Sequence, residues 1–147
     1  MSEIGLTAEC YFLCLLAMLA VVDHLEKSVP RGMTVAAVAL SAAGLVPGID
    51  LSRAFAIGGS LILVILCYCS GKISSQLGRA DAWLLLGTAL ALPSAAFFPG
   101  LLACAVCLGV TALCLFVGTK ERSREIPFLP FLFSGMMFGA IGEAAIW

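Results

Sequence analysis

Residues 101–119 read LLACAVCLGVTALCLFVGT, a stretch without a charged side chain. A helix of about 20 apolar residues is long enough to cross the hydrocarbon core of a bilayer. The rest of the 147-residue chain has the same character, since 62% of its residues are hydrophobic, 12% are charged and its mean hydropathy is +1.12. This composition lies far from that of soluble domains and predicts an integral membrane protein in contact with the lipid bilayer.

Polar breaks divide the chain into six apolar stretches, which we expect to be transmembrane helices. Only helices and closed barrels satisfy the backbone in lipid, and these stretches lack the alternation of a barrel strand. The predicted fold class is therefore all-α, a single-domain polytopic bundle of about six transmembrane helices. Pro47-Gly48 shortens the second stretch, and only the turn signal Pro99-Gly100 separates the fourth from the fifth, so a five-span interpretation stays open. The predicted spans cover residues 5–22, 33–49, 54–70, 82–98, 101–119 and 126–146.

Small residues crowd several of these stretches. They include Gly58 and Gly59 in the third stretch and Gly139 and Gly142 in the sixth. Small side chains permit close approach between neighbouring helices, so we expect a compact bundle.

Basic residues are unevenly distributed among the loops. Seven of the eight Lys and Arg residues follow the first, third and fifth stretches, and only Arg53 lies on the opposite side. Under the positive-inside rule the first, third and fifth loops face the cytoplasm, and both termini are extracytoplasmic. We therefore expect a multi-pass protein of the plasma membrane. The net charge of −1 provides no electrostatic surplus for binding nucleic acid.

Two aspartates lie at the ends of predicted spans on the expected cytoplasmic side. Asp23 ends the first span and Asp81 precedes the fourth. Ionisable groups beside membrane spans are costly, which makes them candidates for function. The structural alternative is helix-end chemistry, in which Asp81 is an N-cap and Asp23 pairs with Lys27 one turn further on.

The residues around the first aspartate resemble a segment of the type IV prepilin peptidases. Residues 23–34 read DHLEKSVPRGMT. In that family an Asp that ends a helix is followed seven residues later by the proline of a turn and then by a Thr. Pro30 stands at this spacing from Asp23.

Two further segments are similar to the same family and come in the same order. Residues 78–85, GRADAWLL, look like the family's GxGD followed by Lys-Leu-Leu at the start of a helix, with Gly78 and Asp81 in the matching positions. Residues 126–132, IPFLPFL, contain Pro127 and Pro130 and resemble the Pro-Phe-Gly-Pro stretch that opens the family's last core helix.

The chain departs from the family pattern in three places. Ala80 replaces the second glycine of GxGD and lacks its access to positive φ. Trp83 stands where the family usually has Lys, and Arg31 stands where it usually has Asn.

The resemblance implies a small, single-domain aspartic membrane endopeptidase without a soluble zinc-binding or methyltransferase domain. It would remove a short basic leader from a prepilin-like or other exported precursor at the cytoplasmic membrane face. The implied catalytic residues are Asp23 and Asp81, and no metal or other cofactor is implied. Support or substrate binding would come from Gly78, Ala80, Pro30, Pro127 and Pro130.

Two neighbouring carboxyl groups can hydrolyse an amide without a metal. Like charges cannot both ionise easily, so one group keeps a proton while the other takes a proton from water. The pair titrates jointly, and the sequence leaves open which of Asp23 and Asp81 is the base. The alternative is a non-catalytic helical membrane protein, such as a degenerate relative, a transporter subunit or an assembly partner. The separation of the two carboxyl groups distinguishes these hypotheses.

Overall fold

The computed structural model describes residues 3–26, 29–42, 49–70, 78–119 and 126–146. These residues form six helices and no strand, which confirms the all-α prediction. The helices are α1 (Glu3–Glu26), α2 (Arg31–Ser41), α3 (Leu51–Cys69), α5 (Arg79–Ala91), α6 (Ser94–Thr119) and α7 (Leu129–Ile146).

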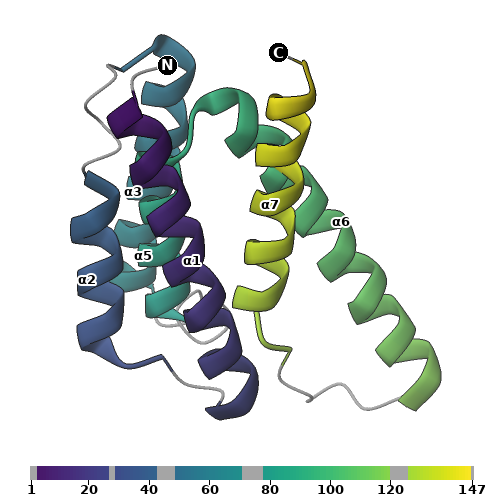
Figure 1. Ribbon diagram of the computed structural model, residues 1–147. Coiled ribbons are helices and arrows are strands. Elements are labelled where there is room, and N and C mark those ends of the chain that lie inside the picture. The colour runs from purple at the N-terminus through teal and green to yellow at the C-terminus, as the bar shows by residue number, and fades with distance from the viewer. Residues whose placement is uncertain (1–2, 27–28, 43–48, 71–77, 120–125, 147) are drawn as a thin grey trace.

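Successive helices run in alternating directions, so that α1 begins and α7 ends at the same end of the molecule (Figure 1). At the opposite end α1, α3 and α6 finish and α2, α5 and α7 begin, and we call this the aspartate end. Helix α5 is central, because it contacts every one of the other five described helices. Helix α7 packs against both α6 and α1.

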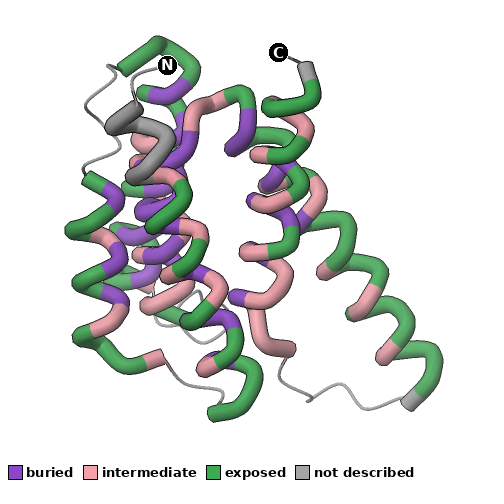
Figure 2. The backbone as a smooth tube through the Cα atoms, viewed as in Figure 1, coloured by how far each residue is buried: buried purple, intermediate pink, exposed green. Residues whose placement is uncertain are grey.

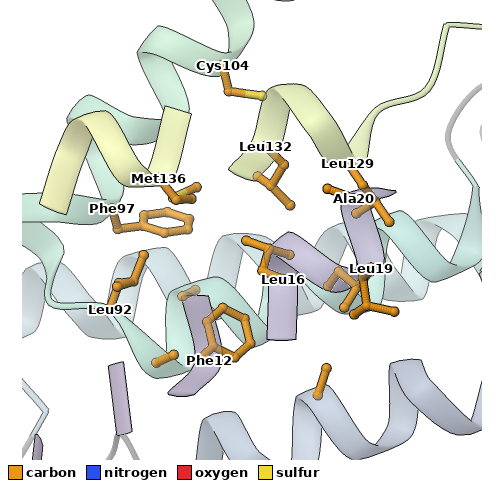
Figure 3. Close-up of a cluster of buried hydrophobic side chains, with 14 of the residues drawn as sticks. Phe12, Leu16, Leu19, Ala20, Leu92, Phe97, Cys104, Leu129, Leu132 and Met136 are labelled. Carbon is orange, nitrogen blue, oxygen red and sulfur yellow. The ribbon is translucent and has the colours of Figure 1, made fainter. Parts of the chain in front are cut away.

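Helices α1 and α7 meet through fully buried apolar side chains that recur at helical spacing (Figure 3). Asp23 continues the α1 stripe, three residues after Ala20, and therefore faces the core. The buried cluster contains Phe12, Leu16, Leu19 and Ala20 of α1 and Leu129, Leu132 and Met136 of α7.

The fourth predicted span, residues 82–98, is interrupted before Pro93. Leu92 ends α5 with an extended backbone, φ −95° and ψ 146°, because a residue that precedes proline avoids the helical conformation. The end of α5 leaves carbonyl groups without helical partners. Buried Arg53 of α3 donates a hydrogen bond to one of them, the carbonyl of Leu90.

The predicted turn at Pro99-Gly100 was wrong, because both residues lie inside α6. Gly100 is buried where α6 crosses α7 at close range. A Cβ atom on Gly100 would lie 2.9 Å from the carbonyl oxygen of Gly135, and a Cβ atom on Gly135 would collide with the carbonyl oxygen of Gly100. Gly100 therefore serves helix packing, which outweighs the local turn preference of a Pro-Gly pair.

Two helices in the described part of the chain are long and apolar enough to cross a membrane. They are α3 and the Ser94–Gly118 portion of α6. Only 28% of the apolar window of α3 and 11% of that of α6 is buried, and Figure 2 shows the exposed class along much of α6. Contiguous apolar surface of this kind is unfavourable in water and suits lipid. The fold therefore indicates membrane association.

Candidate active site

Asp23 lies in the last turn of α1 with 9% of its surface exposed. Its Oδ2 atom accepts a hydrogen bond of 3.3 Å from the backbone N–H of Leu129, the first residue of α7. The first N–H groups of a helix have no partner within the helix and carry partial positive charge. Asp23 thus caps α7 from another helix. Lys27, the predicted partner of Asp23, lies outside the described residues.

Asp81 is the third residue of α5, at the same end of the molecule. The N-cap of α5 is Gly78, so the prediction of Asp81 as N-cap was wrong. The carboxylate of Asp81 instead accepts a hydrogen bond from the backbone N–H of Gly78, which is the acidic half of a capping box. A Cβ atom on Gly78 would lie 2.9 Å from Oδ2 of Asp81, so the glycine leaves room for this carboxylate.

The charge of Asp23 acts directly on Asp81. Burial and, second, the negative charge of Asp23 raise the pKa of Asp81 from 3.8 to about 6, against the opposing effect of the Gly78 hydrogen bond. Helices α1 and α5 are in contact. The structure therefore brings the two predicted catalytic residues into electrostatic contact at one end of the bundle.

Ala80 and Trp83, the two departures from the GxGD pattern, lie in the first turns of α5. Ala80 has a helical backbone and needs no positive φ, so alanine suits this position. The Nε1–H of Trp83 donates a hydrogen bond of 3.2 Å to the hydroxyl of Tyr68 on α3. The Arg79 guanidinium lies 5.2 Å from the centre of the same Tyr68 ring.

The contacts of Tyr68 with Arg79 and Trp83 could not be predicted from the sequence, because Tyr68 belongs to a different predicted span. Only the spacing of Arg79 and Trp83, four residues apart, indicates that those two share a face of one helix.

The predicted proline sites lie at helix starts. Pro30 is the N-cap of α2, and its carbonyl accepts hydrogen bonds from the backbone of Met33 and Thr34. Pro127 precedes α7, and Pro130 is its second residue, where proline sacrifices no helical hydrogen bond. Because Leu129 adjoins Pro130 and donates a hydrogen bond to Asp23, the third segment contacts the first aspartate. The described contacts give Pro30 no part in the pair of aspartates.

Among the described residues, no three His, Cys, Asp or Glu side chains gather to hold a metal ion. Comparison with protein-family models, curated proteins and solved structures finds no match to this chain. The site is therefore interpreted from its own residues and geometry.

Proposed function

We propose that this chain is a membrane-embedded aspartic endopeptidase similar to the type IV prepilin peptidases. It removes a short N-terminal leader from a prepilin-like or other exported precursor. The single observation that carries the proposal is the electrostatic interaction between Asp23 and Asp81, which come from the first and fourth predicted spans. The proposed substrate class is inferred from the resemblance of the surrounding segments to that family.

The surroundings of the two carboxyl groups favour different roles. Asp81 has a pKa of about 6 and so keeps its proton in mildly acidic solution. Asp23 accepts the hydrogen bond from the N–H at the start of α7 through Oδ2. In the proposed reaction Asp23 takes a proton from a water molecule as that water attacks the scissile carbonyl. Asp81 donates a hydrogen bond to the carbonyl oxygen and then assists departure of the amine.

The proposed topology has six spans, with the aspartate end in the cytoplasm. Alternating helix directions and the exposed Arg31 and Arg79 at that end support this orientation. A precursor with an apolar helix in the membrane and a basic leader in the cytoplasm would present the junction between them at this depth. Its cleavage site must be extended before water can attack, because a helical carbonyl is already hydrogen-bonded.

The alternative is a non-catalytic helical membrane protein in which Asp23 has a structural role. The hydrogen bond from the Leu129 N–H favours it, because a capping carboxylate needs no catalytic purpose. Asparagine separates the two interpretations, since its side-chain oxygen can still accept this hydrogen bond but cannot take a proton from water.

The test is cleavage of candidate precursors co-expressed with the chain or with its Asn variants. The precursors carry a basic leader followed by an apolar helix, and the mass of the product reports leader removal. Asp23→Asn and Asp81→Asn should each lower the rate by about 100-fold or more, the range expected for loss of general acid–base catalysis. Asp50→Asn is the matched control, because Asp50 is exposed and precedes α3 at the opposite end.

Normal cleavage by both Asp23→Asn and Asp81→Asn would contradict the proposed mechanism. Full membrane insertion of both variants, measured by quantitative blotting of the membrane fraction, excludes misfolding as the cause of lost activity.

A further inference from the structure

Tyr68 connects the end of α3 with the first turns of α5 through two contacts. Its hydroxyl accepts the hydrogen bond from Trp83, and its ring lies under the Arg79 guanidinium. Tyr68 is the penultimate residue of α3, at the aspartate end. Arg79 and Trp83 flank Asp81 by two residues on either side.

Because α5 is helical, the side on which Tyr68 contacts it determines the direction in which Asp81 points. At about 100° per residue, Arg79 and Trp83 lie nearly one above the other, and Asp81 lies about 200° from each. The face of α5 that carries Arg79 and Trp83 also buries Ala82 and Leu86 against α3. Asp81 is therefore turned away from α3.

Asp81 shares the side of α5 away from α3 with Leu84, three residues on. Leu84 is fully buried in the cluster that also contains Leu16 and Leu19 of α1. Rotation of the first turn of α5 about its axis therefore determines whether Asp81 faces Asp23.

At the start of α5 the backbone N–H of the N-cap, Gly78, donates a hydrogen bond to the carboxylate of Asp81 itself, and Arg79 is exposed. The first turn of a helix frays unless side chains or a neighbouring element hold it. Tyr68 provides such a hold on the side away from Asp81.

We propose that Tyr68 is a positioning residue of the aspartate pair, which holds Arg79 and Trp83 against α3 and thereby aims Asp81 at Asp23. The expected effect of Tyr68 on cleavage kinetics rests on the proposed peptidase function. Its expected effect on the interaction between the Asp23 and Asp81 carboxyl groups does not depend on that function. Trp83 acts through Tyr68 in this arrangement and not as a substitute for a lysine charge.

The experiment uses the full chain in lipid nanodiscs, four single variants of aromatic residues and the Tyr68→Phe/Trp83→Phe double variant, with Asp23→Asn added for the titrations. Tyr68→Leu removes both contacts, Tyr68→Phe and Trp83→Phe each remove the hydrogen bond, and Tyr11→Phe is the control. Tyr11 is the only other tyrosine and is exposed to a similar extent, 68% against 58% for Tyr68.

The first measurement is the pH titration of the ¹³C-labelled aspartate carboxyl groups by NMR. Asp23, Asp50 and Asp81 are the only aspartates, so each resonance can be assigned from an Asn variant. In the otherwise unchanged chain, Asp23→Asn should lower the pKa of Asp81 by removing a neighbouring negative charge. In the Tyr68→Leu chain, Asp23→Asn should lower the pKa of Asp81 by less than about half as much, because the Coulomb interaction between the two carboxyl groups falls with distance.

The second measurement is the kinetics of precursor cleavage. Tyr68→Leu should lower kcat by about 10-fold or more with KM changed by less than about twofold, the signature of misplaced catalytic groups. Tyr68→Phe and Trp83→Phe should have smaller and equal effects, and the double variant should match either single one. Tyr11→Phe should behave as the unchanged chain.

An undiminished effect of Asp23→Asn on Asp81 in the Tyr68→Leu chain would overturn the proposal. If Tyr68→Leu diminishes the effect of Asp23→Asn on the pKa of Asp81 but the unchanged chain cleaves no precursor, the positioning role is supported and the peptidase function is contradicted. If Tyr68→Leu fails to insert, the same comparison in Tyr68→Phe and Trp83→Phe decides, because these variants preserve the aromatic rings.

Discussion

The contacts that hold the carboxyl groups of Asp23 and Asp81 can be predicted from the sequence only in part. Spacing from the end of a polar loop and the GxGD-like letters identify Asp81 and Gly78 as candidates. The hydrogen bond between Leu129 and Asp23 could not be predicted, because 106 residues separate the two in the chain. The contact that holds the Asp81 carboxylate is thus local, whereas the contact that holds Asp23 is tertiary.

Substitution of Gly78 by alanine tests the space around Asp81. The added Cβ atom would lie 2.9 Å from Oδ2 of Asp81, so the carboxylate must move. We expect kcat for leader cleavage to fall by roughly 10- to 100-fold, as for a displacement of about 1 Å at a catalytic group. Gly32→Ala on α2 is the control, since a Cβ atom there meets nothing within 4 Å. Equal activity of Gly78→Ala and Gly32→Ala would refute the expected displacement.

The pH dependence of cleavage follows from the proton that we assign to Asp81. Its pKa is raised to about 6, by burial first and by Asp23 second. The catalytically competent form loses this proton above that pH, so the rate should fall as the pH rises through about 6. The profile of kcat/KM from about pH 4 to about pH 8, about two pH units on either side of this value, measures it. A rate that rises through the same pH interval would mean that Asp81 acts in its deprotonated form, and the catalytic proton would then belong to Asp23.

The same raised pKa affects stability with a defined sign. The folded chain binds the Asp81 proton more tightly than the unfolded chain, whose carboxyl has an ordinary pKa near 3.8. The contribution of Asp81 to the free energy of unfolding is therefore greatest below 3.8 and is lost as the pH rises to about 6. Asp81→Asn should abolish this loss. Denaturant titrations in detergent at several pH values, with Asp50→Asn as the control, provide the comparison.

At the scale of the helices, apolar runs predicted the existence of elements better than their ends. The third predicted span, residues 54–70, corresponds closely to α3, Leu51–Cys69. Pro93 rather than Pro99 divides α5 from α6, because only at Pro93 does the preceding residue leave the helical conformation. Of the small residues expected to permit close packing, Gly139 lies against the backbone of α6, whereas Gly142 meets nothing within 4 Å. Composition marks such positions, and only the crossing point of the helices selects among them.

The crossing of α6 and α7 predicts an asymmetry between two glycines of one helix. Gly135→Ala would place a Cβ atom against the Gly100 carbonyl oxygen and 2.8 Å from the backbone nitrogen of Cys104. These are backbone atoms, so the helices must separate, and we expect a loss of about 1–3 kcal/mol in unfolding free energy. Gly142→Ala should leave stability within about 0.5 kcal/mol, as is usual for a substitution that meets no neighbour. Equal unfolding midpoints in detergent would contradict the close crossing.

For the molecule as a whole, composition predicted membrane association and apolar periodicity predicted the all-α class, but neither predicted which helix is central. Helix α5 has only 13 residues and contacts all five of the other described helices. Its sequence is apolar on nearly every side, as expected of a helix surrounded by others. The helices long and apolar enough to cross a membrane are instead α3 and α6, whose apolar windows are largely exposed.

The proposed orientation predicts opposite accessibility for the two ends of the bundle. Glu26 at the end of α1 and Asp50 before α3 are both exposed and lie at opposite ends. In a chain whose seven cysteines are replaced by alanine, Asp50→Cys should react with an impermeant maleimide on intact cells. Glu26→Cys should react only after the membrane is permeabilised. The reverse pattern would place the aspartate end outside and contradict cleavage at the cytoplasmic face.

The most direct measurement is the titration of the Asp81 carboxyl by ¹³C NMR in the full chain, with and without Asp23→Asn. Proximity of the two groups predicts a pKa of about 6 with Asp23 present and a lower value in the variant. Identical titration of Asp81 in the two proteins would show that the carboxyl groups act independently, and the two aspartates would then not form a catalytic pair.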